Sequence, residues 1–465
     1  MEVLNSAVQQ YAWGKKGSES MVAKLKGLGD SDYTVKKEET YAEMWMGTHP
    51  SGPSRVVRNG VAGPLLKEVL DRNPDMLGAI QNKGDLPFLF KVISINKALS
   101  IQAHPDKRLA ERLHKERPAV YKDDNHKPEM AVTLTDFEGL CGFRRFHEIL
   151  WNLHAYPELR GMVSLTALRA MCSAGNDLQL QRIALKKMFG AFVKCPPNVV
   201  KTQVAALVER LSQPHPPATE VTMRLQLALE EKRMTEIFGR DFRGGAKAAA
   251  ALSSRLQRED VDVRRVMLRL STEYPGDLGI LMPLMLNLLQ LSAGQAFFMT
   301  VDEPHAYLRG DILEVMACSN NVVRAALTPK FRDTNLLVEM LTYNMGAPAV
   351  LQAEFVDSKR VRYTPPITDF ELEDLKVPVK ESYHLKAMPV PGVLVCLCGC
   401  EGGRVVEEDT GKQIKAGEGG VFFLPANVGI VIKAGPSEPL HMAIAHTNLH
   451  WGPLAAAATG RAPTF

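Results

Sequence analysis

The spacing of apolar residues changes twice along this chain. Up to about residue 145, short apolar runs such as residues 88–95 stand between turn signals, which is the pattern of β-strands. From about residue 146 to 270, apolar residues recur every three or four positions, as at Leu207 and Leu211, and this period predicts helices. A strand-like run then returns at residues 294–301. The pattern therefore predicts a helical insertion within a β unit.

The last part of the chain predicts a second β unit. From about residue 345, runs such as residues 393–398 and 420–425 alternate with Gly-rich turns. Short strands at regular spacing are typical of a sandwich or barrel, here a jelly roll. We therefore expect a mainly β protein with two β-barrels and an α-helical domain. The expected ranges are 1–145 and 271–344 for the first β unit, 146–270 for the helical insertion and 345–465 for the second β unit.

Two segments need separate interpretation. The apolar stretch from Leu278 to Leu291 is too short to span a bilayer and is interrupted by three helix-disfavouring or polar residues, so it predicts a buried helix. Residues 244–251, Gly-Gly-Ala-Lys-Ala-Ala-Ala-Ala, are nearly low-complexity and predict a loop or a frayed helix start.

Composition narrows the class of protein only slightly. With 465 residues, 45% of them hydrophobic, the chain can bury several cores and suggests about three domains. The 56 Lys and Arg residues nearly balance the 52 Asp and Glu residues, so the net charge of +4 does not require a nucleic-acid partner. The N-terminus lacks the pattern of a secretory signal, and seven cysteines, an odd number, favour reduced thiols. We expect a protein that stays in the cytoplasm.

A few polar residues have the spacing of a metal site. Gln102 and His104 are two apart after an apolar run, so in a strand they point to the same face. Glu129 and His305 add a carboxylate and a second imidazole, a ligand set that suits Zn²⁺. The alternative is that His104 and His305 are structural histidines beside prolines, because Gln is an uncommon zinc ligand. For His126, beside a lysine, a solvated turn and a catalytic role remain open.

Other metal-like patterns are better explained as structure. Cys396, Cys398 and Cys400 fall on one face of a predicted strand, but the glycines around them indicate a strand that runs into a turn. Small thiols are ordinary core residues. We also expect three C-terminal histidines, which lack the spacing of a metal motif, to be structural: His441, His446 and His450.

Several separated motifs resemble type I mannose-6-phosphate isomerases, in the order of that family. They lie at residues 11–14, 41–50, 87–92, 99–105, 126–130, 139–143 and 304–330, and about half of the chain carries the resemblance. The resemblance implies a cupin catalytic domain that is interrupted by helices and followed by a second jelly roll. It also implies interconversion of mannose 6-phosphate and fructose 6-phosphate, which supplies mannose for GDP-mannose and glycoconjugates.

The same resemblance implies roles for particular residues. One zinc ion per chain is held by Gln102, His104, Glu129 and His305. Arg324 is implied as the catalytic arginine, and Lys127 and Glu314 as pocket residues, either of which could carry the proton between C1 and C2. Further implied pocket residues are Trp13, Glu43, Ser100, Tyr307 and Lys330, with Lys330 and Ser100 as candidates for the phosphate. We expect a monomer whose partner is a sugar phosphate, with neither nucleic acid nor membrane.

Three alternatives remain open from the residues. One is that Arg324 is a structural residue that pairs with Glu314 across two strands. The family usually has Asp where Asn320 stands and Asn where Asp302 stands, which places the role of the usual aspartate in doubt. A non-catalytic cupin that binds a sugar phosphate, or less readily an iron-dependent oxygenase, would also fit a cupin fold.

Overall fold

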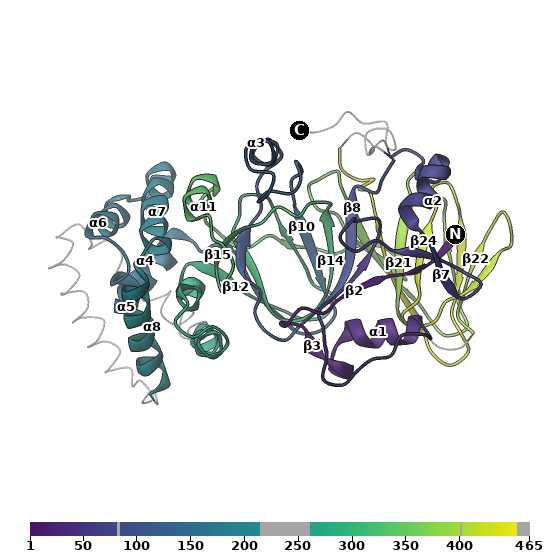
Figure 1. Cartoon of the computed structure of the whole chain (residues 1–465), viewed down its shortest axis with the longest axis horizontal. Helices are drawn as coiled ribbons and strands as arrows, with labels where there is room; N and C mark the ends of the chain where they lie inside the picture. The colour runs from purple at the N-terminus through teal and green to yellow at the C-terminus, as the bar shows by residue number, and fades with distance from the viewer. Residues whose placement is uncertain (81–83, 214–260, 400–401, 453–465) are drawn as a thin grey trace.

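The molecule has helices at one end and β-sheets in its middle and at the other end. The computed structural model describes residues 1–80, 84–213, 261–399 and 402–452. Figure 1 shows the helices that follow residue 145 on the left, the central sheet in the middle and the C-terminal strands on the right. The protein is mainly β with a helical part, as the sequence predicted.

The central sheet joins strands from both sides of the helical part. Its longest strand, β14 (His305–Ala317), pairs antiparallel with β8 (Phe88–Ile95) and with β10 (Glu129–Thr133). Every residue of β8 is buried, in agreement with its predicted strand. The other strands of this sheet are β2 (Ala7–Gln9), β5 (Glu43–Met46), β9 (Ile101–Ala103), β11 (Phe137–Phe143), β12 (Leu286–Leu291), β13 (Ala296–Met299), β15 (Val323–Ala326) and β16 (Val350–Leu351).

The two faces of the central sheet have different partners, because successive side chains of a strand point to opposite faces. One face, with Ile93, packs in a cluster with Phe297 and Tyr307. The other face, with Phe90, packs against strands of the C-terminal part. Lys91 therefore lies on the same strand face as Ile93 and points away from the C-terminal part.

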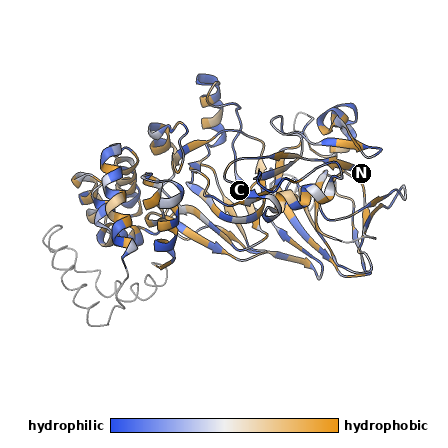
Figure 2. Cartoon of the chain, turned by 60° about the horizontal axis from the view of Figure 1, so that its bottom comes forward, coloured by the Kyte–Doolittle hydropathy of each residue, from blue (hydrophilic) through white to orange (hydrophobic). Residues whose placement is uncertain are grey.

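The helical part begins where the apolar period changes. Its helices are α4 (Phe146–Ala155), α5 (Pro157–Arg160), α6 (Leu165–Ser173), α7 (Leu178–Val193), α8 (Pro197–Ser212) and the helical residues 261–273. Each helix of this bundle carries apolar and polar residues, visible as orange and blue in Figure 2, and their apolar sides form one core that includes Leu207 and Leu211. The low-complexity residues 244–251 lie outside the described residues.

The apolar stretch from Leu278 to Leu291 is buried, but the predicted single helix was wrong. Residues Leu278–Leu284 form a 3₁₀ helix that contains Pro283, and Leu286–Leu291 form strand β12, which pairs with β11. The proline lacks the amide hydrogen that a continuing α-helix needs. A short apolar run has no period that separates a buried strand from a buried helix, and here pairing with β11 determines the outcome.

The C-terminal part is a second β unit that also contains strands from the N-terminus. Its nine-stranded sheet consists of β17 (Glu354–Asp357), β18 (Arg360–Tyr363), β19 (Glu371–Val377), β26 (Leu440–His446), β21 (Gly392–Cys398), β24 (Val421–Leu424), β1 (Glu2–Asn5), β6 (Arg55–Arg58) and β7 (Val61–Leu65). A four-stranded sheet consists of β20 (Ser382–Leu385), β25 (Ile430–Lys433), β22 (Arg404–Glu407) and β23 (Gln413–Lys415). The four domain ranges expected from the sequence stay a prediction. Strands β1, β6 and β7 come from the first of these ranges but belong to the sheet of the last.

The remaining elements cover the sheets and connect them. They are the short pair β3 (Lys15–Lys16) and β4 (Thr40–Tyr41), the 3₁₀ turns Gly17–Glu19 and Pro74–Leu77, and the helices α1 (Met21–Gly29), α2 (Leu66–Arg72), α3 (Lys107–Glu116) and α11 (Thr334–Met340). Among the described residues, no helix has the length and apolar character required to pass through a bilayer. The six described cysteines are free thiols, as expected, and Cys400 is outside the described residues.

Candidate metal and active centre

The central sheet brings the predicted metal ligands together from distant parts of the chain. Gln102 on β9 lies opposite His305, the first residue of β14, and on its other side opposite Arg324 on β15. Glu129 is the first residue of β10, which also pairs with β14. His104 directly follows β9. Three strand ends therefore meet at one place in the sheet.

Three of these side chains form a buried cluster with the geometry of a metal site. Ligand atoms of His104, Glu129 and His305 all lie within 4.8 Å of one another. The Nε2 atom of His104 is 3.3 Å from one oxygen of Glu129, and Nε2 of His305 is 3.1 Å from the other. The Gln102 amide nitrogen lies 3.5 Å from Nε2 of His104, at the edge of the same cluster. All four residues predicted from the sequence are thus neighbours.

Backbone carbonyls hold both imidazole rings in the orientation that a metal requires. Nδ1 of His104 donates to the carbonyl of Asn321 over 2.6 Å, and Nδ1 of His305 donates to the carbonyl of Glu303 over 3.1 Å. Both Nε2 atoms therefore face Glu129 with a free electron pair. Among the described residues, the buried Nε2 of His305 has no hydrogen-bond partner, which fits an atom that serves as a ligand.

The charges at the cluster also suit a cation. Burial, together with the charge of Lys127, lowers the pKa of His104 to about 4, so its ring is neutral near pH 7. Although burial opposes ionisation of Glu129, the Lys127 ammonium 2.9 Å away holds the pKa of that carboxyl well below its usual value. Neutral imidazoles and an ionised carboxylate are the states in which these groups bind metals. The residues therefore fit one divalent ion.

Arg324 lies next to the cluster and has no partner among the described residues. Its strand β15 pairs with β9, in register with Gln102, and its side chain is half-buried. Burial lowers the pKa of its guanidinium, but an arginine stays charged at any working pH. A half-buried arginine without an ion pair has donors available for a ligand.

The predicted alternative, a salt bridge from Arg324 to Glu314, was wrong. Glu314 accepts from Lys91 Nζ over 2.7 Å and from the Tyr307 hydroxyl over 2.6 Å. Lys91 also lies 3.5 Å from Glu43. Glu314 and Glu43 raise the pKa of Lys91 against the opposing effect of burial, so the ammonium stays charged. Lys91 was not predicted as a site residue, although a lysine inside the mostly apolar run of β8 is the signal that identifies it.

We expect Glu314→Ala to destabilise the protein by about 3 kcal/mol, because it leaves a buried ammonium with only the more distant Glu43. Urea unfolding of the variant and of the unchanged protein measures the difference. Glu339→Ala is the matched control, since Glu339 pairs with Lys186 on the surface and its loss should cost less than about 1 kcal/mol. Equal unfolding midpoints for Glu314→Ala and the unchanged protein would contradict a buried ion pair.

The other predicted pocket residues lie at different depths. Ser100 is half-buried and donates to the Gln102 amide oxygen over 3.1 Å. Trp13 is half-buried, packs beside the Tyr307 cluster and contacts the ring of Tyr11. Glu43 accepts from the Trp45 indole and belongs to the network of Lys91. Lys330 is exposed, in the segment that follows β15.

The two departures from the family pattern lie in loops that support the histidines. The Ser319–Asn321 turn is organised by Asp123, whose carboxylate accepts from the Ser319 hydroxyl and the Asn320 amide, each over 2.7 Å. Asn320 itself is exposed. Asp302 has a positive φ of 58°, a conformation that Asn and Asp adopt more readily than most residues, and its amide donates to the carbonyl of His104. Asp123 was not predicted from the sequence.

The C-terminal histidines make structural contacts, in agreement with the prediction. His441 pairs with Asp374, and His450 contacts both oxygens of the buried Glu371 at 2.9 Å. His446 is fully buried and its Nδ1 donates to the carbonyl of Thr447 over 2.9 Å.

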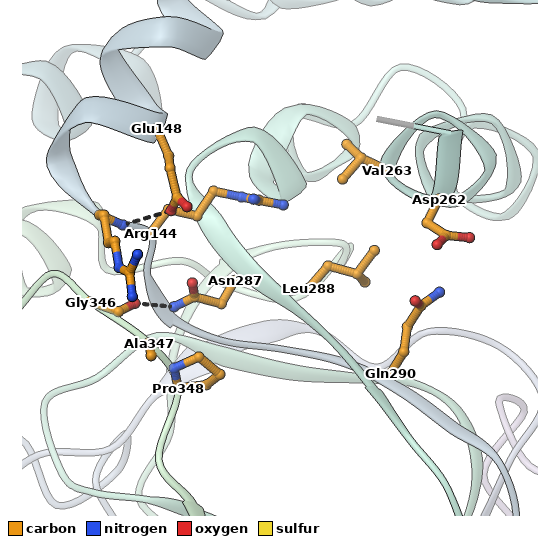
Figure 3. Close-up of a pocket in the computed structure, with 11 residues that line it drawn as sticks. Arg144, Glu148, Asp262, Val263, Asn287, Leu288, Gln290, Gly346, Ala347 and Pro348 are labelled. Carbon is orange, nitrogen blue, oxygen red and sulfur yellow. Dashed lines mark hydrogen bonds between the residues drawn. The ribbon is translucent and has the colours of Figure 1, made fainter. Parts of the chain in front are cut away.

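A separate cavity of about 290 Å³ lies between the start of α4 and strand β12 (Figure 3). The Asn287 amide at its wall donates to the carbonyl of Gly346 over 3.0 Å, and Glu148 accepts from the backbone of Arg145 over 3.1 Å. None of the predicted ligands or pocket residues lines it. A smaller cavity of about 200 Å³ does include His305 and Glu303 in its wall, so it adjoins the cluster.

Comparisons with known proteins all match this chain to one family of isomerases. Residues 1–146 match the model of the catalytic domain of type I phosphomannose isomerases. The chain is 37% identical over 442 residues to the mannose-6-phosphate isomerase of Mus musculus, which covers 92% of this chain and 94% of the relative. It is 35% identical over 445 residues to mannose-6-phosphate isomerase 1 of Arabidopsis thaliana, with 95% and 93% covered.

Solved structures give the same result for the fold. The apo form of mannose 6-phosphate isomerase from Salmonella typhimurium superposes with a TM-score of 0.72 at 25% identity, over 97% of this chain and 99% of that chain. A mannose 6-phosphate isomerase bound with zinc and yttrium superposes with a TM-score of 0.70 at 25% identity, over 97% and 100% of the two chains. The match therefore extends through the helical part and both β units.

Proposed function

The chain belongs to the mannose-6-phosphate isomerase family and is an isomerase, and from this premise we propose how its residues interconvert mannose 6-phosphate and fructose 6-phosphate. The observation that carries the proposal is the convergence of His104, Glu129 and His305, with Lys127 in contact with Glu129 and Arg324 beside Gln102. Ligands, an acid-base group and a fixed cation thus meet at one place, which a protein that only binds a sugar phosphate does not require.

Gln102, His104, Glu129 and His305 would hold one zinc ion. When bound, zinc supplies a Lewis acid that polarises an oxygen of the substrate. The orientation of both Nε2 atoms toward Glu129 supports this assignment. An iron-dependent oxygenase is less well supported, because the carboxamide of Gln102 stands beside two imidazoles where that class typically has a His-rich set.

The reaction moves a proton from C2 to C1 and a hydroxyl proton from O2 to O1. Negative charge develops on two adjacent oxygens of an enediolate between these transfers. Arg324 is proposed to donate two aligned N–H groups to these oxygens, because its guanidinium is half-buried and charged and has no ion pair among the described residues. Donors fixed in advance cost no reorganisation when the charge appears.

We assign the proton between C2 and C1 to Lys127 rather than to Glu314. Once Lys127 has given up the ammonium proton that it carries in its pair with Glu129, it would take the proton from C2 as a neutral amine, and as an ammonium it would return that proton to C1. Both oxygens of Glu314 are already committed to Lys91 and Tyr307, whereas the Lys127 side chain is buried beside the metal ligand Glu129. Glu314 is therefore better suited to hold Lys91 in place.

The assignments of the other pocket residues rest on the family resemblance. Lys330 and Ser100 are proposed for the phosphate, and Trp13, Glu43 and Tyr307 for the walls of the pocket. We also propose that both β units are cupin-like jelly rolls and that the ranges 1–145, 146–270, 271–344 and 345–465 are the domains. The enzyme would act as a cytoplasmic monomer that supplies mannose for GDP-mannose synthesis.

Lys127→Met tests the proton carrier. The thioether cannot accept a proton, so we expect kcat for mannose 6-phosphate to fall by roughly 10²-fold, the lower range for loss of a general acid-base group. Zinc content should stay near one per chain, and the pH profile of kcat should lose one limb. Steady-state kinetics and metal analysis on the same preparation give both results.

Two outcomes would change this assignment. An unchanged bell-shaped profile with only a raised KM would make Lys127 a binding residue. Absence of turnover by the unchanged protein with one zinc bound, together with tight binding of mannose 6-phosphate, would favour the non-catalytic cupin.

A further inference from the structure

The segment that carries Lys127 and Glu129 is held from two sides. On one side, the carbonyl of Asn125 accepts from the Ser319 hydroxyl over 3.0 Å and from the Asn321 amide over 3.1 Å. These contacts come from the turn after β14, within the central sheet region. They fix the backbone at the start of the segment but do not involve the side chain of His126.

On the other side, His126 reaches a residue of the C-terminal part. Its Nε2 atom lies 3.1 Å from Oδ1 of Asp369, which is 243 positions later in the chain, in the connection between β18 and β19. Both side chains are mostly buried. His126 directly precedes Lys127, so this contact is one peptide unit from the proposed proton carrier.

The connection that carries Asp369 is itself braced. The fully buried Asn448 donates from its amide to the carbonyls of Pro365, over 3.0 Å, and Ile367, over 2.7 Å. Two residues beyond Asp369, Glu371 accepts from the backbone of Leu449 over 2.8 Å. The residues that follow β26 therefore hold the Asp369 connection in one position, so the carboxylate is presented from a rigid support.

We propose that Asp369 is a positioning residue for the isomerase centre, supplied by the C-terminal β unit. It holds the ring of His126 and thereby fixes the peptide that orients Lys127. Since a displacement of about 1 Å at a reacting group can cost 10²-fold in rate, a partial loss of this support should be visible in kcat. The inference rests on the role proposed for Lys127. It also assigns the C-terminal unit a part in catalysis.

Asp369→Ala and Asp369→Asn test the inference in the zinc-loaded full chain. We expect kcat of Asp369→Ala for mannose 6-phosphate to fall about tenfold, with KM within about twofold and one zinc per chain retained. Asp369→Asn should recover most of the rate, because its amide oxygen can still accept from His126. A purely structural role would lower the melting temperature without this division between kcat and KM.

Asp374→Ala is the matched control, because Asp374 forms another Asp–His pair in the same unit, with His441. The Asp374 and His441 side chains are 12% and 25% exposed, compared with 16% and 27% for Asp369 and His126. Asp374 lies on β19 and His441 on β26, so this pair holds two C-terminal strands together and does not contact the Lys127 segment. Its loss should leave kcat unchanged.

A double variant separates action through His126 from other causes. If Asp369 acts only through His126, then His126→Ala with Asp369→Ala should be no slower than His126→Ala alone. Additive losses, wild-type kcat in Asp369→Ala, or an equal fall of kcat in Asp374→Ala would each overturn the inference. Absence of activity in the unchanged zinc-loaded protein would instead contradict the proposed function, so the two failures are distinguishable.

Discussion

Replacing Arg324 by alanine is expected to lower kcat by about 10² to 10³, with zinc content nearly unchanged. This is the usual cost of removing one donor aligned in advance with a developing oxyanion. Binding should suffer less than turnover, because the charge on the two substrate oxygens appears only in the transition state. Because Arg324 has no ion pair among the described residues, its removal leaves no other charge unpaired and should change the melting temperature little.

Arg324→Lys serves as the control for charge alone. An ammonium is a compact cation that cannot present two parallel donors to adjacent oxygens, so this variant should recover little of the lost rate. The deciding measurement is kcat together with the melting temperature of both variants. Near-normal turnover in Arg324→Ala would refute the catalytic role, whether or not the protein is destabilised.

His305→Ala should lose zinc and with it nearly all activity, a fall of roughly 10³ or more if the ion contributes several kcal/mol. His305 is one of the three residues whose ligand atoms lie within 4.8 Å of one another, and its Nε2 has no other partner among the described residues. Glu129→Ala should behave alike. The fold should survive in both, because the apolar clusters on each side of the central sheet do not include the ligands.

His441→Ala is the matched control for this loss, since it removes a histidine that pairs with Asp374 in the C-terminal sheet. It should keep one zinc per chain and full turnover. Chelation of the unchanged protein should abolish activity, and added zinc should restore it. Wild-type zinc content in His305→Ala and Glu129→Ala, measured after removal of loosely bound metal, would show that the ligands are other residues.

Local patterns predicted the types of elements well, because strand and helix periods are properties of adjacent residues. The change of period near residue 146 marks the start of α4, and the apolar run at 88–95 is β8. The pairing of Lys91 with Glu314 could not be predicted from such local patterns. Its only signal is one charge in an apolar strand, and the partner lies 223 positions away, in a strand whose register no local pattern gives.

The parts that could not be predicted depend on packing between distant segments. Leu286–Leu291 became a strand because β11 offered an unpaired edge, which an apolar run alone does not indicate. The contact of His126 with Asp369 joins two β units, so neither residue has a local signal for it. The metal ligands were found because rare residue types recur in motifs of the family, whereas Asp123 supports them through contacts with a turn that is distant in sequence.

The place of β1 in the C-terminal sheet has a consequence for synthesis on the ribosome. Glu2 of β1 pairs with Phe423 of β24, so a strand near the start of this sequence is paired by one near its end. At 5–20 residues per second, roughly 20 to 80 s separate the translation of these two strands. Throughout that interval the nascent β1 has an open edge that could pair wrongly with another chain. A message truncated before the codons for β24 would yield a polypeptide that never closes this edge. The pairing of β1 is therefore completed only after β24 has been synthesised.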